Sequence, residues 1–288
     1  MPISSIWAWN ATGHRLIAEI AYEHLTIHAK QTFDHYNNAV SSVYKPETFV
    51  ESSVWLDNLS YKDIHWFAPM HYIDIPYSTD GSALPTVQKV NALWAIDNAT
   101  KLLLNKYPSD FDKGIAFRIL LHIIGDIHQP LHAITKVSTE FPEGDKGGNL
   151  VLLHNNPVAK NLHAYWDRGA GLFMSNRLKP NQIEEEAARI EAKWPCSVFP
   201  LISDATEWVH ESHAIAVNDA YHFPINHAYQ IKAQQITEKR IAAAGCRLAE
   251  VLNEIDAQIP ANSIRARTIK TRRARKISNN QRIAFSLK

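Results

Sequence analysis

Apolar residues recur every three or four positions along most of the chain, the spacing that is typical of amphipathic helices. A first helix is predicted from Thr12, with its apolar stripe at Leu16, Ile17, Ile20, Ala21 and Leu25. Other helices are predicted from Pro85 to Leu104, from an N-cap at Asp112 to just before Pro130, over 184–192, from an N-cap at Asp204 through Val217, and over 229–259. Only residues 72–75 and 150–153 resemble strands. The pattern therefore predicts an all-α protein: a single, mostly helical domain with little β structure.

The composition fits this picture and excludes some classes of protein. The chain has 288 residues, of which 45% are hydrophobic, and its 10 Gly and 14 Pro are too few for a linker-rich chain. No apolar run approaches the length of a membrane-spanning helix. Nothing indicates a membrane segment or an obligate protein partner.

The near-neutral net charge of +1 conceals an uneven distribution of charge. Residues 261–288 contain nine of the 30 basic residues and no acid, which leaves 21 basic against 29 acidic residues in the preceding part. We expect the domain to end near Pro260 and the basic tail to be disordered. An acidic domain that binds a polyanion would need bound cations to reverse the local field.

The N-terminal residues and the two cysteines suggest where the protein resides. Residues 1–8 resemble the end of an export signal with a cleavage point after Ala8, so 1–8 would be a remnant and the domain would run from 9 to 260. Cys196 and Cys246 are too few to build a metal site. They would form one disulfide in an oxidising compartment, or remain two thiols in the cytosol.

The stretch from Ile115 to Ile127 is the most informative for chemistry. It is apolar on almost every face, which indicates a buried helix, yet it contains His122 and Asp126 four positions apart on one side. Burying a carboxylate without a partner costs several kcal/mol, so Asp126 requires a cation or strong hydrogen-bond donors. A His–Asp hydrogen bond and a metal site explain this pair equally well.

Similar residues recur elsewhere, and their number favours the metal site. His163 and Asp167 are again four apart, and the other candidates lie among apolar or aromatic neighbours at His14, Asp57, His71 and His132. Imidazole and carboxylate are the ligands of Zn²⁺ in hydrolytic sites, where one position stays open for water.

These motifs, taken in order, resemble those of the S1/P1-type zinc-dependent nucleases, relatives of the bacterial zinc phospholipases C. The matching segments are Trp9-Asn10-Ala11-Thr12-Gly13-His14, Trp55-Leu56-Asp57, His71-Tyr72-Ile73-Asp74, 122–132, Gly147-Gly148-Asn149 and 161–167. The resemblance spans Trp9 to about Pro260. It implies a mostly helical domain of the phospholipase C/nuclease type with three zinc ions in a cleft.

The resemblance also implies a ligand set for each ion. One zinc would be held by Asp57, His71, His122 and Asp126, and a second by His132, His163 and Asp167. The third would be held by His14, by bridging Asp126, and by the free α-amine and carbonyl of Trp9. This last site requires that Trp9 be the first residue of the mature protein.

The implied activity is hydrolysis of single-stranded DNA and RNA to 5′-phosphate products, with 3′-nucleotidase activity. Tyr72 and Asp74, with Gly148 and Asn149 nearby, match positions that bind and stack the base. Asp57 and Asp126 would serve the reaction through zinc. Relatives commonly carry Arg or Lys where this chain has Ser60, and Lys62 is the candidate to replace that charge.

Two rival functions remain open at this point. A zinc-dependent phospholipase C would use the same metals with a different pocket, although Asp167 and the Tyr72/Asp74 pair favour a nucleic-acid substrate. A non-catalytic helical protein with structural zinc and a nucleic-acid-binding tail is disfavoured by the excess of Asp and His over Cys. With the signal remnant, the favoured function predicts a secreted or periplasmic enzyme.

Overall fold

The computed structural model describes residues 9–60, 66–175, 178–200 and 204–259. Its elements, in chain order, are α1 (Ala11–His24), α2 (Ile27–Val40), α3 (Phe49–Ser52), α4 (Trp55–Ser60), η1 (Ala68–His71), β1 (Pro76–Tyr77), α5 (Ala92–Leu104), α6 (Asp110–Asp126), η2 (Pro130–Ala133), β2 (Thr135–Lys136), α7 (Leu162–Asp167), η3 (Gly169–Gly171), α8 (Pro180–Lys193), η4 (Cys196–Val198), α9 (Ala205–Ile215), η5 (Ala216–Ala220) and α10 (His227–Gln258). The mostly helical single domain predicted from the sequence is confirmed.

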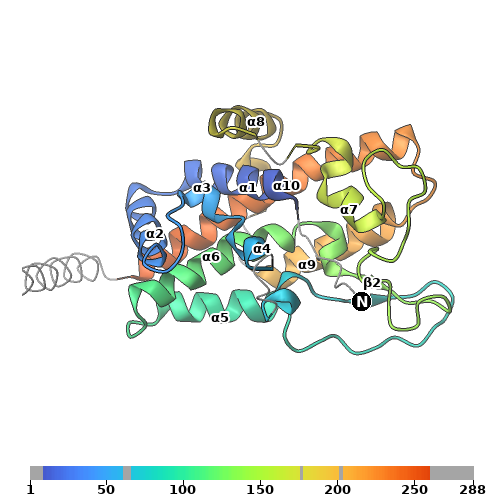
Figure 1. Ribbon diagram of the computed structural model, residues 1–288, viewed down its shortest axis with the longest axis horizontal. Coiled ribbons are helices and arrows are strands. Elements are labelled where there is room, and N and C mark those ends of the chain that lie inside the picture. The colour runs from blue at the N-terminus through green and yellow to red at the C-terminus, as the bar shows by residue number, and fades with distance from the viewer. Residues whose placement is uncertain (1–8, 61–65, 176–177, 201–203, 260–288) are drawn as a thin grey trace, which may run out of the picture.

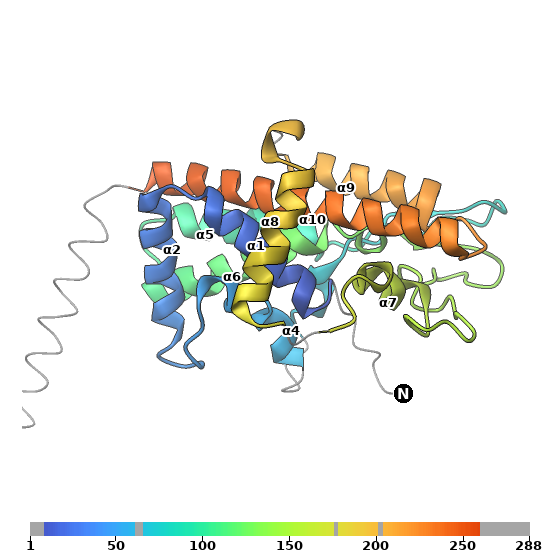
Figure 2. The same cartoon turned by 90° about the horizontal axis from the view of Figure 1, so that it is seen from above.

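Helix α6 lies in the middle of the domain, as its apolar sequence predicts. It packs against α2 and α5 on two sides and against α1, α4 and α10 on the others (Figure 1). Helix α10 runs the length of the molecule, and α8 crosses over α1 (Figure 2). At the contact between α1 and α10, a Cβ on Gly245 would lie only 2.7 Å from Ile20, so glycine permits the close approach.

The hydrophobic core has two parts that flank the candidate site. The larger one joins α1, α2, α5, α6, α8 and α10, with the fully buried Leu16, Phe117 and Leu248 among its members. The smaller one lies under α7 and η5 and contains Trp166 and Leu162. A disulfide between Cys196 and Cys246 fastens η4 to α10, which answers the question that the sequence left open.

The predicted starts of two helices are wrong, and a further helix was missed. The helix predicted from Pro85 begins at Ala92, because the Asn91 side chain accepts a hydrogen bond from the Trp94 N–H and caps it there. Helix α6 is capped by Ser109. Asp112 is instead the third residue of the helix, and its carboxylate accepts a hydrogen bond from the Ser109 N–H to complete a capping box. Helix α2 was not predicted.

The β structure is even smaller than the sequence suggested. The two described strands pair in parallel, with Pro76 opposite Thr135 and Tyr77 opposite Lys136. Segment 72–75 precedes the first strand, and within 150–153 only Leu152 forms an isolated bridge, with Asn161. No described helix has both the length and the apolar character needed to cross a membrane.

Candidate metal centre

Eight of the predicted ligand side chains gather in three groups in the described part of the chain. Within each group the nitrogen and oxygen atoms that could bind a metal lie within 4.8 Å of one another. The groups are His14, His122 and Asp126; Asp57, His71 and His122; and His132, His163 and Asp167. All eight residues are buried, and they come from α1, α4, η1, α6, η2 and α7.

The first centre forms where α4 and η1 meet α6. His122 Nε2 lies 3.4 Å from Asp57 Oδ1, 3.5 Å from Asp126 Oδ1 and 3.1 Å from His71 Nδ1. The other ring nitrogen of His122 donates to the Ser53 carbonyl at 2.6 Å, which fixes the ring orientation. His71 Nδ1 lies 2.9 Å from Asp126 Oδ2. Four ligating groups therefore converge on one small volume.

His14 brings a further nitrogen against Asp126 Oδ1, the same carboxylate oxygen that His122 Nε2 approaches. His14 Nε2 and Asp126 Oδ1 are 3.2 Å apart, both fully buried, yet their geometry forms no hydrogen bond and both atoms are left without one. Buried polar atoms are rarely left unsatisfied, because each costs free energy. Two such atoms facing the same point are the arrangement that a bound cation would satisfy.

Trp9 lies next to this group. Its buried indole Nε1 donates to the Gly125 carbonyl at 3.1 Å, beside Asp126. The following residue, Asn10, donates its backbone N–H to the Asp167 carbonyl at 3.0 Å. These bonds fix the Trp9 side chain beside α6 and the Asn10 backbone beside the end of α7.

The second centre pairs two imidazoles with Asp167. His132 Nδ1 donates to the His71 carbonyl at 2.7 Å, and His163 Nδ1 donates to the Gly147 carbonyl at 2.8 Å. In the neutral rings both Nε2 atoms therefore carry lone pairs, and these atoms face each other at 3.1 Å. Two lone pairs at this distance repel each other, and a cation between them would remove the repulsion.

Gln129 and Gly147 support this second centre, a role that was not predicted for either residue. Gln129 Nε2 donates to Asp167 Oδ1 at 2.6 Å and leaves the other oxygen, Oδ2, 3.7 Å from His163 Nε2. A Cβ on Gly147 would lie 2.3 Å from the Leu131 carbonyl oxygen, and its φ is +59°. Only glycine allows this loop to approach His163.

A network of polar side chains fixes Ile127 and His128, which connect the two centres. Arg240 Nε donates to the His128 carbonyl, and the Ser212 hydroxyl donates to the Ile127 carbonyl. Arg247 donates to His128 Nε2 at 3.1 Å, and Glu211 accepts from both arginines at 2.6 Å. The network fixes the backbone just before Gln129, yet His128 itself is not aimed at the centre.

Charge is balanced differently in the two centres. Burial raises the pKa of Asp126, but the neighbouring imidazoles of His122, His14 and His71 outweigh it and hold that pKa below its usual value. Burial lowers the pKa of His122, whereas Asp126 and Asp57 more than compensate and raise it to about 9. Burial, with the charges of Asp57 and Asp126, raises the pKa of Asp167 well above its usual value.

The predicted base-binding residues lie beside the second centre. Tyr72 and Asp74 are half-buried, and burial followed by the charge of Asp145 raises the pKa of Asp74 to about 6. Asp145, not singled out from the sequence, accepts from the Lys136 N–H and from the Tyr221 hydroxyl.

Asp145 begins the loop that contains the other two predicted residues. The Gly148 carbonyl accepts from the backbone N–H of the ligand His163 at 3.3 Å. Asn149 donates to the Lys146 carbonyl at 2.9 Å. Lys62 lies outside the described residues.

The helical fold and the three buried clusters of His and Asp place this chain in a class of helical proteins whose residues could hold several metal ions in one site. The family model described as S1/P1 Nuclease matches residues 9–257. The chain belongs to the S1/P1 nuclease family. Family membership supports nuclease activity, as the sequence predicted.

Relatives cover nearly the whole chain. Endonuclease 2 of Arabidopsis thaliana is 27% identical over 286 residues, which is 87% of this chain and 91% of that protein. Nuclease S1 of Aspergillus oryzae is 26% identical, with 88% and 93% covered. Nuclease P1 of Penicillium citrinum is 23% identical, with 86% and 97% covered.

Proposed function

We propose that this protein is a zinc-dependent endonuclease that hydrolyses phosphodiester bonds of single-stranded DNA and RNA to 5′-phosphate products and also removes 3′-phosphates from nucleotides. The observation that carries the proposal is the pair of buried nitrogens facing each other at 3.1 Å in the second centre, together with the unsatisfied His14 and Asp126 atoms in the first. Relatives named as nucleases support the choice of substrate over a phospholipid.

Three zinc ions fit the donor atoms. Asp57, His71, His122 and Asp126 would hold the first ion, and His132, His163 and Asp167 the second. His14, Asp126 and the amine and carbonyl of Trp9 would hold the third, because an amine and its own carbonyl close a five-membered chelate. All donors are nitrogen or oxygen, as in hydrolytic zinc sites. When bound, the ions supply Lewis acidity and a deprotonated water near neutral pH.

The chain's own residues would position the substrate around these ions. Asp126 would contribute to both metal positions of the first centre. Tyr72 offers an aromatic face for an unstacked base, and Asp74 offers a carboxylate to the edge of that base. A base must leave a duplex to reach both, which favours single strands. Lys62, which lies outside the described residues, is the residue that the sequence offers as a positive charge for the transition state.

A combined metal and activity assay tests the proposal. The purified protein, trimmed to begin at Trp9, should contain about three zinc ions, cleave single-stranded DNA and release phosphate from 3′-AMP. EDTA should abolish both activities, and added zinc should restore them. Protein free of zinc that still cleaves in EDTA would refute the proposal. Hydrolysis of choline phospholipids in place of nucleic acid would favour the phospholipase alternative.

Export follows from the same reasoning. A free amine at Trp9 requires a peptidase that removes residues 1–8, and such peptidases act on exported chains. The disulfide between Cys196 and Cys246 fits an oxidising compartment. We therefore propose that the protein is secreted or periplasmic.

A further inference from the structure

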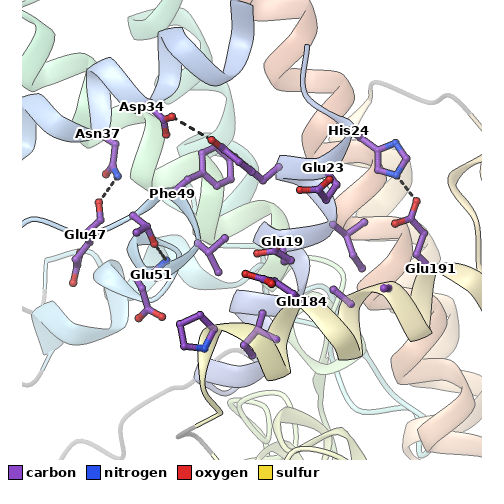
Figure 3. Close-up of a pocket in the computed structure, with 18 of the residues that line it drawn as sticks. Glu19, Glu23, His24, Asp34, Asn37, Glu47, Phe49, Glu51, Glu184 and Glu191 are labelled. Atoms are coloured by element: carbon purple, nitrogen blue, oxygen red, sulfur yellow. Dashed lines mark hydrogen bonds and ion pairs between the residues drawn. The ribbon is translucent and has the colours of Figure 1, made fainter. Parts of the chain in front are cut away.

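A large groove lies on the face of α1 remote from α6. It has a volume of about 1190 Å³ and runs between α1, α2, α3 and α8 (Figure 3). Its lining is apolar at Ile20, Phe49 and Ile183. Acidic side chains surround these apolar residues, and the groove is called the acidic groove below: Glu19, Glu23, Asp34, Glu47, Glu51, Glu184 and Glu191.

Part of this negative charge forms no ion pair within the described residues. Glu47 and Glu51 pair with Arg118 and Arg15. No ion pair to Glu19, Glu23 or Glu184 occurs within the described ranges. Burial, and then the nearby charges of Glu184 and Glu23, raise the pKa of Glu19 against the opposing charge of Lys30. A cationic partner would relieve that repulsion.

The chain itself supplies a matching cationic segment. Residues 261–288 carry nine Lys and Arg side chains and no acid, whereas the groove carries seven carboxylates. The segment also contains aliphatic residues such as Ile264 and Ile269. These could contact the apolar lining while the basic side chains face the carboxylates. Charge and hydrophobicity are thus complementary on both sides.

The described chain ends close to this groove. Near the end of α10, Asn253 donates to the carbonyl of His24, a residue that lines the groove. Asp256 accepts from His28 and Thr32 of α2, whose Asp34 also lines it. A smaller cavity of about 300 Å³ adjoins at His24 and adds the acidic side chains of Glu250 and Glu254.

The length of the segment is sufficient for an intramolecular contact. Arg265 follows the last described residue, Ile259, by six positions, and six residues span up to roughly 20 Å. A tethered segment of this length has an effective concentration in the millimolar range, so even weak ionic contacts would keep it bound.

We propose that the basic segment 261–288 binds in the acidic groove of its own molecule. Bound there, its charges are not available to the phosphates of a polynucleotide. Because exposed ion pairs are screened by salt, the contact weakens as ionic strength rises. Alternative occupants of the groove are the basic segment of a second copy and an unrelated basic peptide.

Zero-length carbodiimide crosslinking of the full chain, followed by peptide mapping, tests the contact directly. In monomeric protein, Lys270 or Lys276 should become linked to Glu19, Glu23, Glu184 or Glu191. A groove variant with Glu19→Gln, Glu184→Gln and Glu191→Gln leaves Glu23 as a crosslinking site. The yield of links to Glu23 should fall by at least about five-fold in this variant, because the remaining ionic attraction is weak and screened. Links between two molecules, or links to acidic residues outside the groove, would overturn the proposal.

A matched control variant carries Glu140→Gln, Glu143→Gln and Glu207→Gln, three exposed residues that do not line the groove. It removes the same charge and should crosslink like the parent protein. Equal losses in both variants would show that only the overall charge matters, which also overturns the proposal.

Limited trypsin digestion gives an independent measurement that needs no variant. The rate of cleavage within 265–276 should increase several-fold between about 50 and 500 mM salt, relative to a free peptide of the same sequence. The groove variant should be cleaved at the fast rate at both salt concentrations. A parent protein cleaved as fast as the free peptide at low salt would refute docking, even if the groove variant failed to fold.

Discussion

Replacing Glu211 by glutamine tests the electrostatic role of the network behind the metal centre. Glu211 accepts from Arg240 at 2.6 Å and from both terminal nitrogens of Arg247 at 2.6 and 2.8 Å. The two arginine side chains are only 6% and 3% exposed. Glutamine keeps the size and one acceptor oxygen, but it leaves two buried guanidinium groups without a counter-charge.

The structure sets the expected magnitude. Removing one partner of a fully buried ion pair costs roughly 3–5 kcal/mol. The Glu211 side chain is 35% exposed, so water screens part of this interaction. Arg240 also retains the Trp208 carbonyl and the Ser212 hydroxyl as acceptors. We therefore expect the free energy of unfolding to fall by about 2 kcal/mol at neutral pH.

The effect should depend on pH in a definite direction. Burial raises the pKa of Glu211, but Arg247 and Arg240 outweigh it and lower that pKa from 4.5 to about 2. A carboxylate with a depressed pKa contributes stability that is fully present above its unfolded pKa and is lost as the pH falls through the folded value. The difference between parent and variant should thus be constant above pH 5 and shrink toward pH 2.

Urea unfolding of both proteins between pH 3 and pH 7 measures this difference. Taking the difference cancels the contribution of bound metal, which both proteins share. Glu207→Gln, one helical turn away and exposed, serves as the matched control and should change stability by less than about 0.5 kcal/mol. A Glu211→Gln effect that is equally large at pH 3 and pH 7 would contradict the electrostatic explanation.

Four other predictions address the proposed site. Gln129→Leu removes the hydrogen bond to Asp167 and should lower zinc affinity about 10- to 100-fold, as measured by competition with a chelator. Because the pKa of Asp74 is raised to about 6, KM for 3′-AMP should increase as the pH falls through 6, and Asp74→Asn should abolish that dependence. Lys62→Met should reduce kcat and leave zinc content unchanged; an unchanged kcat would remove Lys62 from the mechanism. N-terminal sequencing of the exported protein should begin at Trp9, and a chain that starts at Met1 would contradict the third zinc site.

The fold class and the candidate ligands could be predicted from the sequence, because apolar periodicity and short His/Asp motifs are both local patterns. The apolar positions of α1 and α10 follow a helical period, and His122 with Asp126 lie four apart on one buried helix. Such spacing fixes the face of a helix without knowledge of the rest of the fold. The start of α5 was predicted wrongly because it depends on a contact with a residue that is distant in the sequence. The segment before Asn91 is held by a distant contact, in which the Gln88 side chain accepts from the Asp74 N–H.

The supporting residues could not be predicted, because their roles exist only in three dimensions. Arg240 and Arg247 follow the His128 that they hold by more than one hundred positions. Nothing in the sequence around Glu211 indicates that it neutralises two buried arginines. Ser53 contributes only its carbonyl, so its side chain gives no signal of the contact with His122.

The two centres also differ in how strongly they require a cation. In the first, a His122 whose pKa is about 9 lies beside two aspartates whose pKa values are lowered, so imidazolium and carboxylates compensate one another. In the second, burial and the neighbouring Asp57 and Asp126 favour the protonated form of Asp167.

A metal ion entering either centre must therefore displace a proton, from His122 in one case and from Asp167 in the other. Metal affinity should rise with pH at both. A cation in the second centre would also relieve the two facing imidazole nitrogens of His132 and His163. These His and Asp residues stood out in the sequence because their neighbours are apolar. The burial that follows from those neighbours also couples metal binding to proton release.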